Sequence, residues 1–291
     1  MSQKPAKELL RQVINELANL YEEREVTALA RHYLHDRFHV DSMKLAMNSP
    51  IHFDEKLMHH DLRLLRASTP LQHVVGFGEF YGRKFKCGPE ALIPRPETEE
   101  LVNWVIEDHH QIIRSSNHQI KVLDIGTGTG CIPIILALEV SGLKAEGIDI
   151  SKEALRLATQ NAEHLKADIG FSQIDILEEN LSGQYDIIIS NPPYIPESDK
   201  AQMHSNVLEH EPGLALFVPN SDPLLFYRTI AQKAKLSLKD GGVVYFEIHE
   251  SFGAQVKSLL ENEGFTQVSI RQDLQGKDRM ARAHIKGKVQ K

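Results

Sequence analysis

The chain has 291 residues, a formal net charge of −7 and a hydrophobic share of 41%, values that are ordinary for a globular protein. This length accommodates one large domain or two unequal ones. The acidic balance argues against a protein that grips a long stretch of nucleic-acid phosphates, and no apolar run approaches the roughly 20 residues needed to span a bilayer.

Cysteine use and the N-terminal sequence predict a cytoplasmic location. No apolar segment of the kind found in signal peptides follows Met1. Cys87 and Cys131 are the only cysteines, and so few in a chain of this length indicate a reducing compartment without a disulfide scaffold. We therefore expect neither secretion nor a membrane association.

The fifteen histidines do not show the spacing of a metal site. No His-Glu-x-x-His motif is present, and the pairs His59-His60 and His109-His110 are adjacent, so that on a helix their side chains point in different directions. Because metal-ligand spacing is specific, we expect exposed helix histidines and no bound metal.

Helical periodicity dominates the first 72 residues. Apolar residues recur at helical spacing at Leu9, Val13, Leu17 and Leu20 and again at Met58, Leu62 and Leu65. Asp41 and Asp54 are candidate N-caps, and Ser49-Pro50 breaks the pattern between them. We expect roughly four or five short helices packed as a bundle, which is either a stabilising cap or a docking surface for a macromolecular partner.

Residues 73–90 change to short β-type runs punctuated by glycines, a pattern typical of a β-hairpin linker. Pro94-Arg95-Pro96 then fixes an extended loop, because each proline restricts the residue before it. Thr98 is a candidate cap for the following helix, whose Leu101, Val102, Val105 and Ile106 share one face.

Strand and helix patterns alternate from about residue 120 onward. We expect strands over Lys121–Ile125, Ala145–Ile150, Phe171–Ile176, Tyr185–Ser190, Val243–Ile248, Thr266–Arg271 and Met280–Ile285, with helices near 131–140, 151–165, 223–238 and 253–262. This order predicts an α/β fold, with a largely parallel sheet covered by helices on both faces. Ligands bind such sheets at the carboxyl ends of the strands.

The first of these strands ends in a glycine-rich loop. Gly126, Gly128 and Gly130 allow a tight turn and a close approach of the backbone to a ligand. The helix that follows presents its N-terminus, which favours an anionic group such as a pyrophosphate or an amino-acid carboxylate. The spacing departs from Gly-x-Gly-x-x-Gly, and this favours the methyl donor S-adenosylmethionine over a dinucleotide.

Two aspartates at strand ends complete the predicted cofactor site. Asp149 lies at the end of the next strand, where its carboxylate can accept both ribose hydroxyls of a nucleoside. Asp124, at the end of the first strand, can orient the glycine loop or meet the ammonium group of the ligand.

A third strand end carries Asn191-Pro192-Pro193-Tyr194. The side-chain oxygen of Asn191 and the carbonyl of Pro192 can accept both hydrogens of a planar –NH2 group and hold its nitrogen toward an electrophile. Tyr194 can pack over that planar group. We therefore predict transfer of a methyl group to an amide or an exocyclic amine, with Asn191, Pro192 and Tyr194 as the catalytic residues.

At this point the chain resembles the bacterial-type protein-(glutamine-N5) methyltransferases of peptide chain release factors. The resemblance rests on motifs that lie between about residues 70 and 285. They are Leu92-Ile93-Pro94-Arg95-Pro96-Glu97-Thr98-Glu99, Asp124-Ile125-Gly126-Thr127-Gly128-Thr129-Gly130, Asn191-Pro192-Pro193-Tyr194-Ile195-Pro196, Glu211-Pro212, Ala215-Leu216, Phe226-Tyr227-Arg228 and Asp278-Arg279. The resemblance implies a Rossmann-like S-adenosylmethionine-dependent methyltransferase sheet with a small N-terminal helical domain and a β-hairpin linker.

The resemblance also implies an organisation and a reaction. The expected parts are a helical substrate-docking domain (1–72), the hairpin linker (73–90) and the methyltransferase domain (91–288). The expected substrate is the glutamine of a Gly-Gly-Gln motif in class 1 release factors, methylated on its N5 nitrogen, with S-adenosylhomocysteine as the second product.

Site residues follow by position in this sequence. The predicted contacts to S-adenosylmethionine are Asp124, Gly126, Thr127, Gly128, Thr129, Gly130, Asp149, Ile176 and Asn191. The predicted contacts to the substrate are Ile93, Pro94, Arg95, Asn191, Pro192, Pro193 and Tyr194. Two positions depart from the family pattern: His249 stands where a glycine is common, and Ile176 is aliphatic where an aromatic residue is frequent.

Two alternative functions fit parts of the pattern. Adenine presents the same –NH2 geometry, so an N6-adenine methyltransferase acting on nucleic acid by base flipping is one alternative. It predicts a basic, aromatic-rich recognition region, which the acidic balance opposes. A non-catalytic cofactor-binding module is the other, and it predicts a damaged Asn191 or glycine loop. We expect a monomer without direct nucleic-acid binding.

Overall fold

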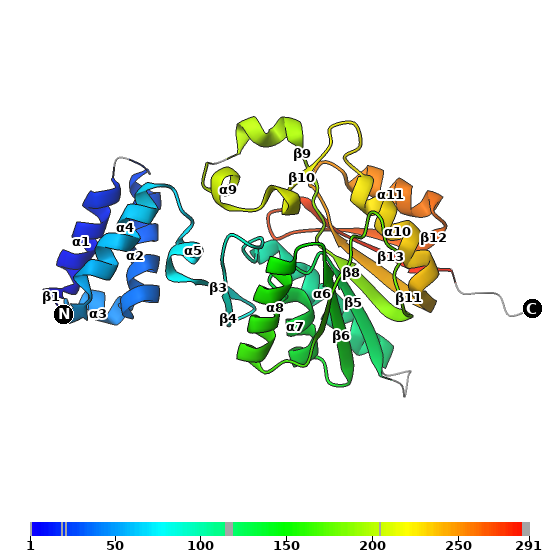
Figure 1. The fold of residues 1–291 in the computed structure, drawn as a ribbon, viewed down its shortest axis with the longest axis horizontal. Helices are drawn as coiled ribbons and strands as arrows, with labels where there is room; N and C mark the ends of the chain where they lie inside the picture. The colour runs from blue at the N-terminus through cyan, green and yellow to red at the C-terminus, as the bar shows by residue number, and fades with distance from the viewer. Residues whose placement is uncertain (1, 19, 21, 114–118, 204, 287–291) are drawn as a thin grey trace, which may run out of the picture. The chain divides into compact units, whose positions relative to one another are not determined.

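The computed structural model describes residues 2–18, 20, 22–113, 119–203 and 205–286. The chain divides into two compact units, one made of residues 1–77 and 204–210 and the other of residues 78–203 and 211–291. Figure 1 shows the helices within residues 1–77 in blue and cyan, the helix of residues 205–210 in yellow-green, and the sheet of the second unit in green to red.

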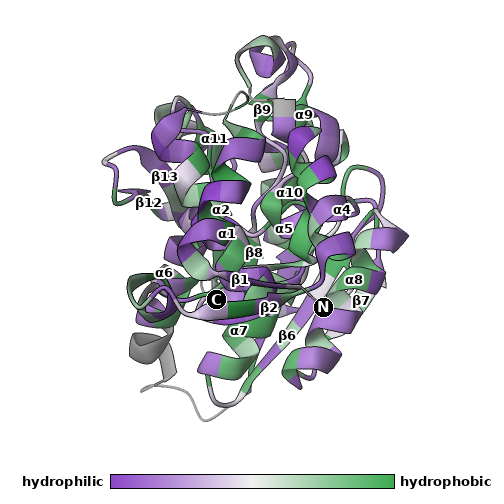
Figure 2. Cartoon of the chain, turned by 90° about the vertical axis from the view of Figure 1, so that its left-hand side faces the viewer, coloured by the Kyte–Doolittle hydropathy of each residue, from purple (hydrophilic) through white to green (hydrophobic). Residues whose placement is uncertain are grey.

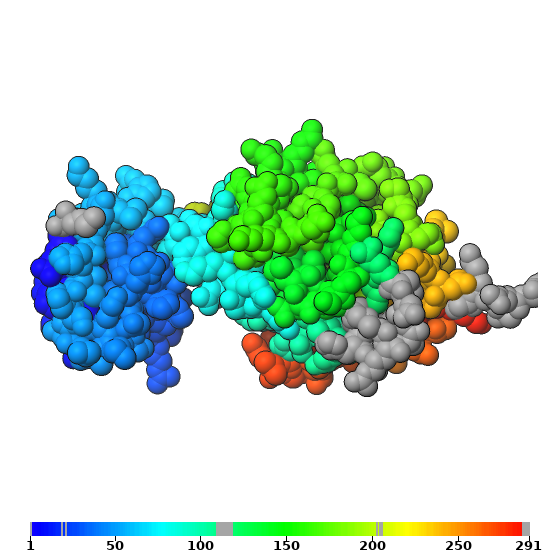
Figure 3. All heavy atoms as spheres, turned by 90° about the horizontal axis from the view of Figure 1, so that it is seen from below, coloured from blue at the N-terminus to red at the C-terminus, as the bar shows by residue number. Residues whose placement is uncertain are grey.

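The first unit is mainly helical. Its elements are β1 (Ser2–Pro5), α1 (Ala6–Leu17), α2 (Glu23–Phe38), α3 (Ser42–Ala46), β2 (Pro50–Phe53), α4 (Glu55–Arg66), α5 (Leu71–Val75) and α9 (Ser205–His210). The periodic apolar residues of α1 and α4 are buried together in one core with Val26, Tyr33 and Phe53. The predicted helix bundle is therefore present, and in the space-filling view its blue atoms form one continuous body (Figure 3).

The expectation of helix throughout this region was wrong at two places. Ser2–Pro5 and Pro50–Phe53 pair as antiparallel strands. Ile51 and Phe53 are buried whereas Pro50 and His52 are exposed, so this segment follows the period of a strand. Pro50 also cannot donate a helical hydrogen bond.

Capping aspartates fix the starts of two helices, as predicted. The Asp41 carboxylate accepts a hydrogen bond from the Lys44 amide at 2.7 Å. Asp54 accepts from the Lys56 and Leu57 amides. Each carboxylate satisfies amides that have no partner within the helix.

A β-hairpin occurs where the linker was predicted. β3 (Phe77–Phe80) and β4 (Arg83–Lys86) form a two-stranded sheet. Tyr81 and Gly82 between them have φ values of 52° and 68°, as a two-residue turn between twisted strands requires.

The second unit is built on a seven-stranded sheet with the order β12-β13-β11-β8-β5-β6-β7. The strands are β5 (Ile120–Ile125), β6 (Leu143–Asp149), β7 (Gly170–Gln173), β8 (Tyr185–Ser190), β11 (Leu238–Glu247), β12 (Phe265–Gln272) and β13 (Asp278–Ile285). β5 to β8 and β11 are parallel, whereas β13 runs antiparallel to both of its neighbours. The expected Rossmann-like sheet is thus confirmed.

Helices cover both faces of this sheet. They are α6 (Pro96–Ile113), α7 (Cys131–Glu139), α8 (Lys152–Leu165), α10 (Leu225–Ser237) and α11 (Gly253–Asn262). Val122 of β5 packs in one core with α6 and α7, and the adjacent Leu123 packs in the other with α10 and α11. This alternation is what a strand buried on both faces requires. In Figure 2, α8 carries both hydrophobic and hydrophilic colours, as a helix with one buried face should.

The sheet order places its topological switch point between β5 and β8. The chain proceeds from β5 to β6 and β7 on one side and then returns to β8 on the other. The hydroxyl of Ser190, at the end of β8, donates to the Ile125 carbonyl at the end of β5 at 2.7 Å. The two strand ends are therefore held together where ligands bind such sheets.

The segment between β8 and α10, to which no strand or helix was assigned from the sequence, has structure of its own. It contains β9 (Ile195–Pro196), η1 (Glu197–Gln202), η2 (Gly213–Ala215) and β10 (Phe217–Val218) in addition to α9. β9 and β10 pair in parallel.

Two kinds of feature are not found among the described residues. No helix there is long and apolar enough to cross a membrane. No group of three or more His, Cys, Asp or Glu side chains in the same part of the chain has the arrangement of a metal site.

Candidate active site

A cavity of about 250 Å³ lies at the carboxyl ends of β5, β6 and β8. Twelve of the predicted site residues line it, namely Ile93, Pro94, Arg95, Gly126, Thr127, Gly128, Thr129, Asp149, Ile176, Asn191, Pro192 and Pro193. The fold therefore brings segments that are far apart in sequence to one wall, although Asp124, Gly130 and Tyr194 do not contribute to that wall.

The glycine loop adopts a backbone conformation that side chains disfavour. Gly126, Gly128 and Gly130 have φ values of 74°, 53° and 77°, in the left-handed region that glycine enters without steric cost. A Cβ at Gly130 would lie 3.1 Å from both Ala158 and Phe171. Gly130 therefore allows close packing of the loop, which explains why it lies behind the cavity wall.

Asn161 holds the glycine loop from behind. Its buried side chain donates to the Thr129 carbonyl at 3.0 Å. It also accepts from the Lys86 amide at 2.7 Å and donates to the Lys86 carbonyl. Sequence analysis missed this residue, because nothing in a helical segment signals a hydrogen bond to a loop 32 residues away.

Asp149 has the geometry of a loop-bound carboxylate. Its two oxygens accept from the Gly128 and Ser151 amides, each at 2.9 Å. Burial raises the pKa of Asp149, and hydrogen bonds from backbone amides oppose that shift. Each carboxylate oxygen keeps a second lone pair, so Asp149 can hold the loop and still accept ligand hydroxyls.

Asp124 differs because its oxygens lack partners. The residue is fully buried, and neither oxygen meets hydrogen-bond geometry with another described residue. Burial raises the pKa of Asp124 to about 7, and the nearby Thr127 hydroxyl, which does not reach hydrogen-bond geometry with it, opposes part of this shift. A buried carboxylate without partners is unfavourable, and a cationic ligand group nearby would relieve this cost.

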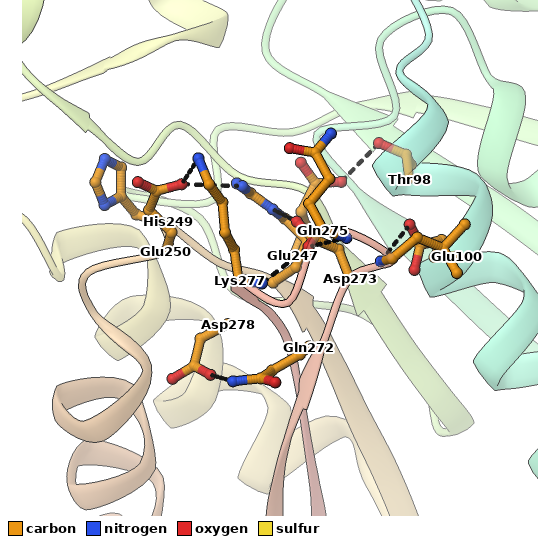
Figure 4. A network of polar contacts seen from close by, with 12 residues as sticks. Thr98, Glu100, Glu247, His249, Glu250, Gln272, Asp273, Gln275, Lys277 and Asp278 are labelled. Carbon is orange, nitrogen blue, oxygen red and sulfur yellow. Dashed lines mark hydrogen bonds and ion pairs between the residues drawn. The ribbon is translucent and has the colours of Figure 1, made fainter.

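Asn191 is oriented by a residue from another element. Its side-chain nitrogen donates to the Thr98 hydroxyl at 3.2 Å. The Thr98 hydroxyl donates to Glu247 at 2.6 Å, a contact drawn in Figure 4. Thr98 lies inside α6, which begins at Pro96, so the prediction that Thr98 caps this helix was wrong. Its hydroxyl is engaged with Glu247 and Asn191 instead.

Tyr194 does not line the cavity, and its hydroxyl is engaged by a buried carboxylate. That hydroxyl donates to Glu247 at 3.1 Å. The ring also contacts His249 edge-on, with ring centroids 6.0 Å apart, and His249 packs against Phe252 at 4.9 Å. The departure from the glycine common in the family thus places an aromatic ring beside Tyr194.

Glu211 fixes the Pro-Arg-Pro loop at the cavity. It is buried, pairs with the Arg95 guanidinium at 2.5 Å and accepts from the Ile93 amide at 3.2 Å. The positive charge of Arg95 is therefore already compensated. The proposed role of Arg95 at the substrate mouth rests on its position in the wall.

Apolar side chains complete the wall. Ile176, Phe226 and Ile230 line one part of it, and Ile176 and Ile230 are buried. Sequence analysis assigned no site role to Phe226 or Ile230, because their helical spacing is equally typical of core residues. Their contribution depends on how α10 packs on the sheet.

These residues fit the methyl donor expected from the sequence. The largely apolar wall can receive a planar base, and Asp149, which lines it, can accept hydroxyls. Moreover, a Cβ at Gly126 would meet no atom within 4 Å, so the backbone there borders open space. A ligand can approach it closely.

Comparison with known proteins gives a consistent result. Residues 111–211 match the family model described as "Methyltransferase small domain". A protein of Flavobacterium psychrophilum named release factor glutamine methyltransferase is 38% identical over 94% of this chain and 97% of its own length. Proteins with the same name from Bacillus subtilis and Lactococcus lactis are 39% and 41% identical over 80% and 78% of this chain, and over 82% and 84% of their own lengths.

Solved structures support the fold. The hMettl16 catalytic domain, in complex with the MAT2A 3'UTR hairpin 6, has a TM-score of 0.56 and 18% identity, over 72% of this chain and 77% of its own. The 16S rRNA N2 G1207 methyltransferase of Thermus thermophilus has a TM-score of 0.50 and 17% identity, over 72% and 50%. At this identity the likeness shows a shared fold alone.

Proposed function

This chain belongs to the family of release factor glutamine methyltransferases, and we propose that it methylates the N5 nitrogen of the glutamine in the Gly-Gly-Gln motif of class 1 release factors. One observation links this reaction to the cavity described above. Asn191 and Pro192 line the same cavity as Gly126, Gly128 and Asp149. An acceptor for an amide –NH2 group and a nucleoside-binding loop therefore share one space.

Positioning supplies most of the catalysis in this proposal. An amide nitrogen is a poor nucleophile, because its lone pair is delocalised into the carbonyl. The side-chain oxygen of Asn191 and the carbonyl of Pro192 accept the two N–H groups and fix the nitrogen on the approach line. S-adenosylmethionine, when bound, supplies the electrophilic methyl carbon. The nitrogen becomes more acidic as the new N–C bond forms, and its surplus proton leaves to solvent.

We assign the following residues to the binding of S-adenosylmethionine. Gly126 to Gly130 form the loop against the methyl donor, Asp149 accepts its ribose hydroxyls, and Asp124 compensates its ammonium charge. Ile176 contributes to the apolar wall that receives the base. Ile93, Pro94 and Arg95 border the entrance for the substrate loop.

We further propose that the helical residues 1–72 form the substrate-docking domain, that 73–90 serve as linker and that 91–288 carry the chemistry. Two buried cysteines without a disulfide support a cytoplasmic location. We expect a monomer that does not bind nucleic acid directly.

The test is mass spectrometry of a purified class 1 release factor incubated with this protein and S-adenosylmethionine. We expect one added methyl group on the glutamine of Gly-Gly-Gln, and a release factor with that glutamine replaced by alanine is the control. Methylation of adenine in added nucleic acid, with none on the release factor, would replace this proposal by the adenine alternative. No transfer to either would indicate a non-catalytic module.

A further inference from the structure

Three residues behind Asn191 form a chain of hydrogen bonds that reaches across the fold. Thr98 comes from α6, Glu247 from the end of β11, and Tyr194 from the loop after β8. Both Thr98 and Glu247 are almost completely buried, at 3% and 2% exposure. The Glu247 carboxylate accepts from Thr98 on one oxygen and from Tyr194 on the other.

The chemistry of the hydroxyl gives this chain a direction. A threonine hydroxyl has one hydrogen to donate and lone pairs to accept with, whereas an ionised carboxylate can only accept. Thr98 therefore gives its hydrogen to Glu247, and its oxygen must receive a hydrogen from Asn191. The –NH2 group of Asn191 consequently faces Thr98, and the side-chain oxygen of Asn191 lies on the opposite side of the amide.

Hydrogen bonds and one neighbouring positive charge stabilise the carboxylate form of Glu247, although burial has the larger effect and raises its pKa overall. Burial raises the pKa of Glu247, while the hydrogen bonds from Thr98 and Tyr194 and the positive charge of Arg279 oppose this shift. Arg279 is 13% exposed and pairs with Asp273 at 3.1 Å and Glu250 at 3.5 Å. Figure 4 shows Asp273, Glu250 and Lys277 in this same group of polar contacts.

We propose that Thr98 and Glu247, supported by Tyr194, are positioning residues that fix the amide of Asn191 with its carbonyl oxygen available to the substrate. The inference rests on the proposed function, because it assigns that oxygen as an acceptor for the glutamine –NH2 group. With the amide turned over, Asn191 would present a donor to the substrate N–H groups and an acceptor to Thr98. Both contacts would be lost.

The first test compares Thr98→Val with Thr98→Ser. Valine keeps the shape of the side chain but removes the hydroxyl, whereas serine keeps the hydroxyl. We expect Thr98→Val to lower kcat by tenfold or more, with the Kd for S-adenosylmethionine within about twofold of wild type. Thr98→Ser should restore kcat to within about threefold of wild type. The exposed Thr159→Val is the matched control, because its hydroxyl bonds only the Leu155 carbonyl in its own helix.

A second readout does not depend on catalysis. In protein labelled with ¹⁵N-asparagine, Asn191 gives a pair of side-chain amide NMR signals that Asn191→Ala assigns by their loss. We expect that pair to be sharp in wild type and Thr98→Ser, and broadened or shifted in Thr98→Val and in Glu247→Ala. If Thr98→Val does not fold, Tyr194→Phe and Glu247→Gln provide the same comparison with smaller changes.

The outcomes separate the inference from the proposed function. Unchanged NMR signals and wild-type kcat in Thr98→Val would overturn the positioning role. Equal loss of kcat in the serine and valine variants, together with loss of S-adenosylmethionine binding, would also overturn it by indicating a merely structural residue. Failure of wild type to methylate a release factor would contradict the proposed function alone, since the NMR comparison would still report the orientation of Asn191.

Discussion

Two buried aspartates, one in each unit, show how the same side chain serves different purposes. Asp61 in the helical unit is 1% exposed and accepts from the Tyr33 hydroxyl at 3.1 Å and from Arg37 at 2.7 Å. Asp124 in the sheet unit is fully buried, yet neither of its oxygens has a hydrogen-bond partner among the described residues.

The two aspartates differ in whether the protein itself supplies the groups that compensate them. The charge on Asp61 is satisfied by its own neighbours, as expected of a structural ion pair. Asp124 has no such pairing in the described part of the chain, and buried, unsatisfied groups of this kind are typical of functional sites. Asp61 is thus paired within its own unit, whereas we propose that Asp124 is compensated by a bound ligand.

The largest effect on activity is expected at Asn191, which follows β8 in the sheet unit. Asn191→Ala removes the acceptor for the substrate amide and should lower kcat roughly 10²- to 10³-fold, with folding and methyl-donor binding retained. Single-turnover methylation of a release factor and calorimetric titration of S-adenosylmethionine measure the two quantities. The exposed Asn262→Ala serves as control, and wild-type activity in Asn191→Ala would remove this residue from the mechanism.

The next effect concerns the satisfied aspartate. Asp61→Ala leaves Tyr33 without its acceptor and Arg37 with the Val74 carbonyl but no paired carboxylate, and we expect a loss of about 3 kcal/mol in the free energy of unfolding. Chemical denaturation measures this loss, and hydrogen exchange should locate it in α2 and α4. Affinity for S-adenosylmethionine, measured under native conditions, should stay at the wild-type value. A weakened affinity would contradict the view that Asp61 serves only the structure of the helical unit.

Asp124→Asn, in contrast to Asp61→Ala, should weaken ligand binding. We expect at least about tenfold weaker binding of the methyl donor, because a charge-assisted contact is lost. The pKa of Asp124 in the folded protein is about 7, above its ordinary value of 3.8, so the folded state binds the extra proton between these values. Its contribution to stability is therefore present at low pH and lost as pH rises through about 7.

Denaturation of both proteins without ligand at pH 5 and pH 8 tests this sign. The asparagine variant should gain stability relative to wild type as pH rises. A variant that falls further behind wild type at pH 8 would show that Asp124 has a stabilising partner in the folded protein.

The smallest effect is expected at His249. His249→Ala removes the ring contacts with Tyr194 and Phe252 and should cost about 1 kcal/mol. Burial lowers the pKa of His249 below 6.5, so the folded protein binds this proton less readily than the unfolded chain. The contribution of His249 is thus present above pH 6.5 and lost as pH falls below it. Thermal melts of wild type and variant between pH 5 and 8 measure the difference, with the exposed His164→Ala as control.

Local pattern was sufficient for much of the fold. The period of apolar residues predicted α1 and α4, two capping aspartates predicted helix starts, and alternating strands and helices predicted the sheet. It was insufficient where pairing partners lie far away: Pro50–Phe53 became a strand because it pairs with Ser2–Pro5, and no short-range period in a four-residue segment reveals such a partner.

Short segments of the sequence also predicted the main residues of the candidate site. They are the glycines after β5, Asp149 and Asn191-Pro192-Pro193. Each of these follows a strand, so the parallel order alone brings them to one edge of the sheet. The hydrogen bonds that support these residues could not be predicted from local sequence. Asn161 holds the loop, Glu211 holds Arg95, and Thr98 joins Asn191 to Glu247, which lies 149 residues after Thr98 in the sequence. Hydrogen bonds of this kind depend on the directions of the side chains. These directions are fixed only when the helices pack on the sheet, so a sequence pattern does not predict them.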